Sequence, residues 1–278
     1  MAKNKLVAPV LKWVGGKRQL LPEIRSLLPK QIKSYCEPFV GGGAVLFDLQ
    51  PKNAIINDIN SDLILVYSVI KKDVEGLIKE LEKYPNEEEF YYNLRNIDRE
   101  QEMFNALTDI KKAARVIYLN KTCYNGLYRV NNSGEFNSPF GKYKNPNIVN
   151  APVLRAVSTY FNSSDIVFSS SDFSEIINAV KKGTFVYLDP PYDPVSDTSS
   201  FTGYSRGGFT RAQQIQLREC CDSLNERGIK FMLSNSATEF IREQYAAYHI
   251  KTVQAKRAIN SVATRRGDVD EVIITNYD

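Results

Sequence analysis

The chain has 278 residues, of which 43% are hydrophobic and 24% charged, with a formal net charge of +4. This length can bury a substantial core, in one large domain or two smaller ones. Four cysteines without CxxC spacing predict reduced packing residues, and a single histidine argues against a histidine zinc site or a serine–histidine couple. The sequence shows no membrane-length apolar run and no signal-peptide pattern, which favours a cytoplasmic protein.

A glycine pair near the N-terminus precedes a helical pattern over residues 20–28. Trp13 and Lys17 flank Gly15 and Gly16 with an aromatic ring and a positive charge. Glycines at this point let the backbone come close to a ligand. The alternative is a plain glycine-rich entry to a helix, with the tryptophan in the core.

Residues 35–47 are predicted to form a strand, a glycine-rich turn and the start of a helix. Glu37 ends the strand, and the glycines at 41–43 permit positive φ and close approach to a ligand. A second strand, 54–57, ends in Asp58, where an acid can accept hydrogen bonds from both hydroxyls of a ribose. The spacing is not GxGxxG, so the pattern predicts a nucleoside site without a pyrophosphate, as S-adenosylmethionine requires.

Residues 62–112 have the pattern of charged helices, and 113–119 that of a further helix. The segment 121–144 is rich in glycine and asparagine, and Asn132-Ser133-Gly134 predicts a hairpin tip. Its basic residues alternate with aromatic and amide side chains, which can bond base edges and wedge between bases. A β-hairpin also fits the DNA major groove; the alternative is a polar surface loop.

After a predicted linker around Pro146 and Pro152, the α/β pattern resumes. Strands are predicted at 166–168, 185–188, 231–234, 248–253 and 269–275, with a helix over 210–226. The stretch 193–208 has the length of a lid-like loop. A basic loop contains Lys256, Arg257, Arg265 and Arg266, for which phosphate contact and plain solvation both stay open.

The strand at 185–188 runs into Asp189-Pro190-Pro191-Tyr192. Proline has a fixed φ and no N–H, so strand pairing ends there in a stiff turn. The turn displays a carboxylate, backbone carbonyls and a ring at the carboxyl edge of a sheet, where open α/β folds bind ligands. Acceptors beside a ring suit a planar group that carries an amine, such as a nucleobase. The alternative is a strand ending in a solvated aspartate.

In this order the motifs resemble those of the DNA adenine-N6 methyltransferases of the Dam family, GATC-methylating branch, over nearly the whole chain. The matching segments are 12–17, 37–43, 58–60, 124–141, 172–173 and 189–192. A glycine loop, then a recognition insert, then Asp-Pro-Pro-Tyr is the order of the α group of amino-methyltransferases. The resemblance implies an α/β fold: a Rossmann-like, S-adenosylmethionine-dependent methyltransferase sheet from residues 1–61 and 150–278. Residues 62–149 would form an inserted, mainly helical DNA-recognition domain that carries a β-hairpin.

The resemblance also implies roles for individual residues. The cofactor-binding residues would be Trp13, Lys17, Glu37, Pro38, Phe39, Gly41, Gly43, Asp58, Asp172, Phe173 and Asp189. The catalytic residues would be Asp189, Pro190, Pro191 and Tyr192, with the first carboxylate and the Pro190 carbonyl receiving the target amine and the tyrosine stacking on the base. The DNA-binding residues would be Lys12, Tyr124, Leu127, Arg129, Asn137, Pro139 and Lys142. Some relatives have arginine in place of Lys142, and lysine cannot make the same two-pronged guanine contact.

The implied reaction is base flipping in duplex DNA, at GATC sites, followed by direct transfer of a methyl group from S-adenosylmethionine to the adenine N6 amine without a metal. A cognate restriction endonuclease is a compatible partner, and no motif sets an oligomeric state. Three alternatives stay open. They are a cytosine-N4 methyltransferase, which usually has serine where Asp189 stands, an RNA adenine methyltransferase, and a non-catalytic nucleic-acid-binding relative.

Overall fold

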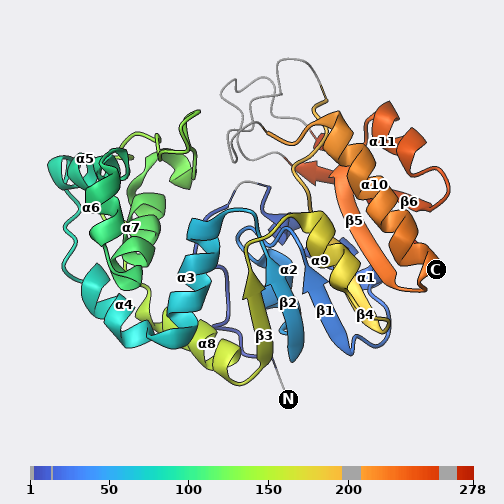
Figure 1. The fold of residues 1–278 in the computed structure, drawn as a ribbon, viewed down its shortest axis with the longest axis horizontal. Helices are drawn as coiled ribbons and strands as arrows, with labels where there is room; N and C mark the ends of the chain where they lie inside the picture. Colours follow the sequence, from blue (N-terminus) through green and yellow to red (C-terminus); the bar gives the residue numbers. More distant parts are fainter. Residues whose placement is uncertain (1–2, 14, 196–207, 257–267) are drawn as a thin grey trace.

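One seven-stranded sheet organises the computed structural model, which describes residues 3–13, 15–195, 208–256 and 268–278 (Figure 1). The strands are β1 (Ser34–Glu37), β2 (Asn53–Asn57), β3 (Asp165–Ser169), β4 (Thr184–Leu188), β5 (Lys230–Ser236), β6 (His249–Lys256) and β7 (Asp268–Thr275). Their order in space is β3-β2-β1-β4-β5-β7-β6, and β7 runs antiparallel to both of its neighbours. The predicted α/β class, with a Rossmann-like methyltransferase sheet, is confirmed.

The carboxyl ends of the parallel strands meet at one edge of this sheet. β1 pairs with β2 on one side and with β4 on the other, and Cys36 lies opposite both Ile55 and Val186. The chain builds outward from β1 through β2 to β3 and then returns to the far side of β1 with β4. The loops after β1 and β4 therefore flank a topological switch point, where open α/β sheets bind ligands.

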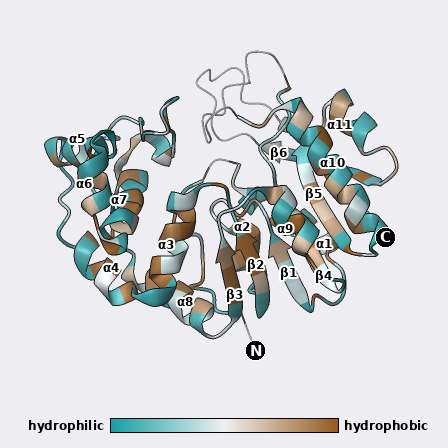
Figure 2. Cartoon of the chain, viewed as in Figure 1, coloured by the Kyte–Doolittle hydropathy of each residue, from teal (hydrophilic) through white to brown (hydrophobic). Residues whose placement is uncertain are grey.

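Helices cover both faces of the sheet, and Figure 2 shows hydrophobic residues on the strands and on the helix sides that face them. The α-helices are α1 (Leu21–Leu27), α2 (Ala44–Leu49), α3 (Ser61–Lys72), α4 (Val74–Leu81), α5 (Glu88–Asn96), α6 (Gln101–Ala106), α7 (Asp109–Thr122), α8 (Ala151–Asn162), α9 (Phe173–Ala179), α10 (Arg211–Glu226) and α11 (Glu239–Gln244). No helix in the described part of the chain combines the length and apolar character needed to span a membrane.

The buried side chains of β4 show how the two faces are filled. All five residues of β4 are buried, as expected for a central strand of a parallel sheet. Phe185 and Tyr187 belong to a hydrophobic cluster shared with α2, α3 and α8, whereas Val186 and Leu188 belong to a cluster shared with α9, α10 and α11. The first cluster continues from the sheet through α3 into α4, α5 and α7. The helical insert is thus packed onto the sheet through a continuous core.

The segment after α7 forms a short hairpin. Isolated bridges join Val130 to Phe136 and Cys123 to Phe140, and no longer strand is formed there in the described structure. The predicted tip contains Gly134 with φ +86°, a conformation that glycine adopts without strain. The hairpin follows a short 3₁₀ turn, Tyr124–Gly126, that leads directly out of α7.

Several predicted boundaries were wrong. Pro152 does not lie in a linker but in the first turn of α8, where the missing N–H of proline leaves no helical hydrogen bond unmade. The predicted break near residue 112 is absent, because the Thr108 side chain accepts a hydrogen bond from the Lys111 N–H and starts α7 at Asp109. The pattern also gave no sign of α11. All four cysteines are buried and none forms a disulfide in the described structure, in agreement with their predicted packing role.

Candidate active site

The Asp-Pro-Pro-Tyr turn lies directly after β4, at the carboxyl edge of the sheet. Lys17 reaches this turn from the N-terminal segment: its Nζ lies 2.8 Å from Asp189 Oδ1 and 4.5 Å from the centre of the Tyr192 ring. The same Nζ donates a hydrogen bond to the Gly15 carbonyl at 2.7 Å. Lys17 is only 5% exposed, so these partners replace most of its contacts with water.

The Asp189 carboxyl has one close charged partner, the Lys17 ammonium. Burial raises its pKa to about 6, against the opposing effect of the Lys17 ammonium, and Glu271 on β7 raises it further. Oδ1 is buried, and in the described part of the chain its close partner is the Lys17 ammonium, 2.8 Å away. A half-buried carboxylate with a raised pKa, paired with a buried ammonium at a sheet edge, is typical of a functional site.

The Tyr192 ring is fixed at its far end. Its hydroxyl donates a hydrogen bond to Glu271 Oε2 at 2.8 Å, and this glutamate lies on β7. One face of the ring therefore meets a cation, while the hydroxyl is held by the C-terminal part of the sheet. Glu271 was not identified from the sequence, because nothing in the pattern of its strand distinguishes it from a solvated edge residue.

The glycine turn after β1 faces Asp58 at the end of β2. The Gly41 N–H donates to Asp58 Oδ2 at 3.0 Å, and the Asn60 N–H donates to Oδ1 at 2.9 Å. Burial raises the pKa of Asp58 to about 6, and these two backbone donors lower it in part. Gly41 has φ +48°, and an added Cβ would lie 2.8 Å from Trp13 Cδ1. The turn thus requires glycine for both its conformation and its space.

Two further predicted residues of this segment point inward. Glu37 is 2% exposed, and its Oε2 accepts a hydrogen bond from the Tyr35 hydroxyl at 2.7 Å. Burial raises the pKa of the Glu37 carboxyl well above its ordinary value, although the Tyr35 bond lowers it. The Pro38 carbonyl accepts a hydrogen bond from Asn57 Nδ2 at 3.0 Å. Trp13 stacks on Tyr128 with ring centres 5.0 Å apart, which connects the glycine turn to the base of the hairpin.

Asn57 ties together the loops that follow three strands. Besides the bond to Pro38, its Nδ2 donates to the Ser171 carbonyl at 3.1 Å, and its Oδ1 accepts from the Ser171 N–H at 2.9 Å. Asn57 is 1% exposed. In the sequence, Asn57 appears only as a polar residue at the end of a predicted strand. Its role in connecting these loops was therefore not predicted.

Aromatic rings form one wall of the site. The Phe39 ring centre lies 5.3 Å from that of Phe173 and 5.9 Å from that of Phe209. Asp172 caps the N-terminus of α9, and its Oδ1 accepts hydrogen bonds from the Ser174 N–H and hydroxyl. Sequence reasoning missed Phe209, because it follows a hydroxyl-rich loop far along the chain. It also gave no role to Ile59, which is 62% exposed beside Asp58.

The predicted DNA-binding residues gather on the hairpin and on the segment that supports it. Asn120 of α7 holds the Lys12 backbone by two hydrogen bonds, at 2.9 and 2.8 Å, and so joins the N-terminal segment to the insert. Arg129 Nε donates to Asn137 Oδ1 at 2.8 Å across the hairpin.

The remaining predicted DNA-binding residues differ in exposure and in partners. Tyr124 is 57% exposed, and its N–H donates to the Pro139 carbonyl at 2.8 Å. Leu127 is half-buried at the base of the hairpin. Lys142 lies beyond the bridges, where its Nζ is 3.6 Å from the Glu88 carboxylate. Arg257, Arg265 and Arg266 lie outside the described residues, so for them phosphate contact and plain solvation both stay open.

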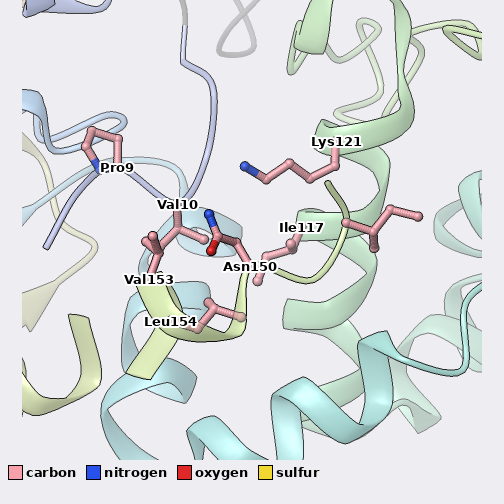
Figure 3. A pocket seen from close by; sticks show the side chains of 8 residues that line it. Pro9, Val10, Ile117, Lys121, Asn150, Val153 and Leu154 are labelled. Atoms are coloured by element: carbon pink, nitrogen blue, oxygen red, sulfur yellow. The ribbon is translucent and has the colours of Figure 1, made fainter. Parts of the chain in front are cut away.

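A small cavity lies between the N-terminal segment, α7 and α8 (Figure 3). Its volume of about 20 Å³ suits a single water, which excludes it as a cofactor site. Lys121 lines it beside Val10 and Ile117. Burial lowers the pKa of the Lys121 ammonium, and the positive charges of Lys12 and Arg18 lower it further. Three cations therefore gather where the insert meets the N-terminal segment.

Comparison with known proteins agrees with this geometry. The family model described as D12 class N6 adenine-specific DNA methyltransferase matches residues 13–259. The type II methyltransferase M.MjaIII of Methanocaldococcus jannaschii is 45% identical over 98% of this chain and 99% of its own length. The type II methyltransferase M1.LlaDCHI of Lactococcus lactis subsp. cremoris is 41% identical over 100% of this chain and 98% of its own length. The DNA adenine methylase of Escherichia coli strain K12 is 36% identical over 98% of this chain and 95% of its own length. The chain belongs to the D12 class N6 adenine-specific DNA methyltransferase family.

Proposed function

We propose that this protein transfers the methyl group of S-adenosylmethionine to the N6 amine of an adenine flipped out of duplex DNA, at GATC sites. One observation carries the proposal: the Asp-Pro-Pro-Tyr turn binds an amine. The Lys17 ammonium is held between the Asp189 carboxylate, at 2.8 Å, and the Tyr192 ring face, at 4.5 Å. An exocyclic amine could donate a hydrogen bond to the same carboxylate while its base stacks on the Tyr192 ring, with π-stacking in place of the cation–π contact.

Lys17 has an alternative partner when a base enters. Its Nζ also bonds the Gly15 carbonyl, so it can leave the carboxylate without losing every acceptor. Asp189 Oδ1 would then accept a hydrogen bond from the target amine, with the Pro190 carbonyl as the second acceptor. These acceptors draw the amine toward tetrahedral geometry and localise a lone pair that is otherwise spread into the ring. The nearby carboxylate stabilises the positive charge that develops on nitrogen, and this charge is lost when the methylated amine releases one proton, to Asp189 or to solvent.

The residues around the glycine turn fit a nucleoside cofactor. Asp58 presents a carboxylate at the end of β2, Gly41 and Gly43 allow close approach, and Phe39 and Phe173 provide an apolar wall. Asp58 would hold the ribose hydroxyls and Asp172 the adenine amine. When bound, the cofactor supplies an electrophilic methyl group on a sulfonium centre. The residues of this chain orient the amine toward it and keep that amine out of bulk water.

The family assignment supports adenine over cytosine as the target, and the hairpin supports a DNA duplex. We propose that residues 62–149 form the DNA-recognition part and the remainder the catalytic part. Relatives named type II methyltransferases favour a role beside a restriction endonuclease that cuts the same site.

Base flipping is tested with 2-aminopurine, a fluorescent adenine analogue that is quenched by stacking. With the analogue at the adenine position of a GATC duplex, binding of the protein and a non-reactive cofactor analogue is expected to raise the emission several-fold, because the base leaves the stack. The same analogue placed outside the site is the control and should show no rise. Equal emission from both positions would argue against extrusion of this base.

Asp58→Ala is expected to weaken S-adenosylmethionine binding by ~1–3 kcal/mol, the range for a hydrogen bond to a charged acceptor. Binding of DNA without cofactor should change little. Isothermal titration calorimetry measures both, and an unchanged cofactor affinity would exclude Asp58 as the ribose ligand.

The pH dependence of cofactor affinity gives a separate expectation. The pKa of Asp58 is raised to about 6, so the carboxylate is ionised above this pH and becomes protonated as the pH falls through it. Protonation removes acceptor capacity, so affinity should be highest above pH 6 and should decline below it. Asp58→Asn is neutral at every pH and should flatten this profile. Parallel profiles for the wild type and Asp58→Asn would contradict the assignment.

A further inference from the structure

The two peptide groups that flank Tyr192 are held by side chains from other elements. Pro190 and Pro191 have no N–H, so the turn cannot orient itself through the hydrogen-bond ladder of the sheet. Instead, Gln214 Nε2 of α10 donates to the Pro191 carbonyl at 2.9 Å. On the other side, the Asp193 N–H donates to Asn235 Oδ1 of β5 at 3.0 Å. These two bonds fix the backbone immediately before and immediately after Tyr192.

The two amide side chains are also bonded to each other. Asn235 Nδ2 donates to Gln214 Oε1 at 3.1 Å, and Asn235 Oδ1 accepts a second bond, from the Ser236 N–H, at 2.8 Å. Gln214 is 1% exposed and Asn235 is fully buried. Neither side-chain amide can exchange its oxygen and nitrogen positions. A flipped Asn235 would direct its NH₂ group at two backbone N–H donors, and a flipped Gln214 would direct its oxygen at the Pro191 carbonyl. The Gln214–Asn235 pair therefore has a single arrangement that links both peptide groups.

The far end of Tyr192 is fixed as well. Its hydroxyl bonds Glu271, and Glu271 Cα pairs with Ser236 across β5 and β7. The ring is thus supported at its backbone by the Gln214–Asn235 pair and at its tip by the neighbouring strand. A rigid ring matters at a transferase site, because misplacement of the reacting groups by about 1 Å can lower the rate on the order of 10²-fold.

We infer that Gln214 and Asn235 are positioning residues for the target base: they set the direction of the Tyr192 ring and of the turn carbonyls that receive the amine. The inference rests on the proposed function and deepens it. Neither residue touches the place where the base would stack. They act through the Pro191 carbonyl and the Asp193 N–H, and so on the orientation of the acceptors rather than on cofactor affinity.

The test replaces a donor by an acceptor of the same size. Gln214→Glu keeps the oxygen that accepts from Asn235 but places a second oxygen against the Pro191 carbonyl. Its kcat is expected to fall at least tenfold, its 2-aminopurine emission in GATC duplex to fall below that of the wild type, and its S-adenosylmethionine Kd to stay within about threefold. A variant that only lost its fold would lose cofactor binding together with kcat and emission. An unchanged Kd for S-adenosylmethionine therefore shows that the fall in kcat and emission does not come from unfolding.

Two further variants make the result interpretable. Asn235→Asp keeps the acceptor for the Asp193 N–H and loses the donor to Gln214, so we expect a smaller fall in kcat, of about three- to tenfold. This variant still tests the inference if Gln214→Glu does not fold. Asn276→Asp is the matched control. This amide accepts from the Phe231 N–H at 2.9 Å and donates to the Ile229 carbonyl at 2.9 Å, at the opposite end of β5. It should lower the thermal unfolding midpoint and leave kcat unchanged.

The outcomes are distinguishable. An active wild type together with Gln214→Glu and Asn235→Asp variants whose kcat lies within twofold of it would overturn the inference and leave the proposed function intact. A fall in kcat shared by Asn276→Asp would also overturn it, because a general effect on β5 would then be responsible. A wild type that binds GATC duplex and transfers no methyl group to adenine would overturn the proposed function, and the inference with it.

Discussion

Asp189→Ala is expected to lower the rate of methyl transfer at least ~10²-fold, the order of loss seen when a preorganised electrostatic partner of a transition state is removed. Oδ1 of this residue already holds an ammonium at 2.8 Å. Cofactor binding should survive in large part. Asp189→Asn should also be poor, since its NH₂ group can face the incoming amine as a donor.

Transfer of label from S-adenosylmethionine to GATC duplex measures the rate, and calorimetry measures cofactor binding. Turnover above about a tenth of the wild-type value, a loss of only ~1.4 kcal/mol in the barrier, would refute the role of Asp189. Asp48→Ala is the matched control, because Asp48 is also ion-paired, to Arg25, but lies on α2 away from the turn. It should leave the rate unchanged. Thermal unfolding of each variant shows whether the Lys17 charge, left without its partner, affects folding.

Arg129→Ala is expected to remove ~1–3 kcal/mol of discrimination at one base pair of the site. The side chain lies exposed on the hairpin, and Nε is already bonded to Asn137 Oδ1 at 2.8 Å. This bond engages Nε, and we expect the two terminal nitrogens to donate to the O6 and N7 atoms of a guanine. The residue should therefore act on sequence choice rather than on binding in general.

Rates on GATC and on sites with one base changed separate the two roles. Lys144→Ala is the control: if this exposed lysine contacts phosphate, the substitution weakens all sequences about equally and reduces the salt dependence by about one unit of slope. If Arg129→Ala lowers the rate on every site by the same factor, the hairpin does not read the sequence and this assignment fails.

The sheet could be predicted from the sequence because its signals are local. The run 185–188 is apolar, ends in two prolines and proved to be a fully buried central strand. The stretch 35–47 likewise showed its strand, turn and helix in order. Errors arose where one residue type serves two purposes. Pro152 marks a linker as readily as a helix start, and only the packing of α8 decides between them.

The connections between elements could not be predicted, because they join residues far apart in the chain. Gln214 appears in the sequence as one position of an amphipathic helix, and Asn235 as one position of a strand. Their bond spans 21 residues and forms only when α10 packs against the sheet. The contact of Lys17 with Asp189 is similar: each residue stands in its own motif, and the fold brings the motifs together.

The most direct test of the proposed reaction is to incubate the purified protein with S-adenosylmethionine and an unmethylated plasmid and to map the modified bases by single-molecule sequencing. We predict N6-methyladenine at GATC sites on both strands, and an unmodified plasmid with the Asp189→Ala variant. Methyl groups on cytosine, or a wild-type reaction that leaves every adenine unmodified, would contradict it.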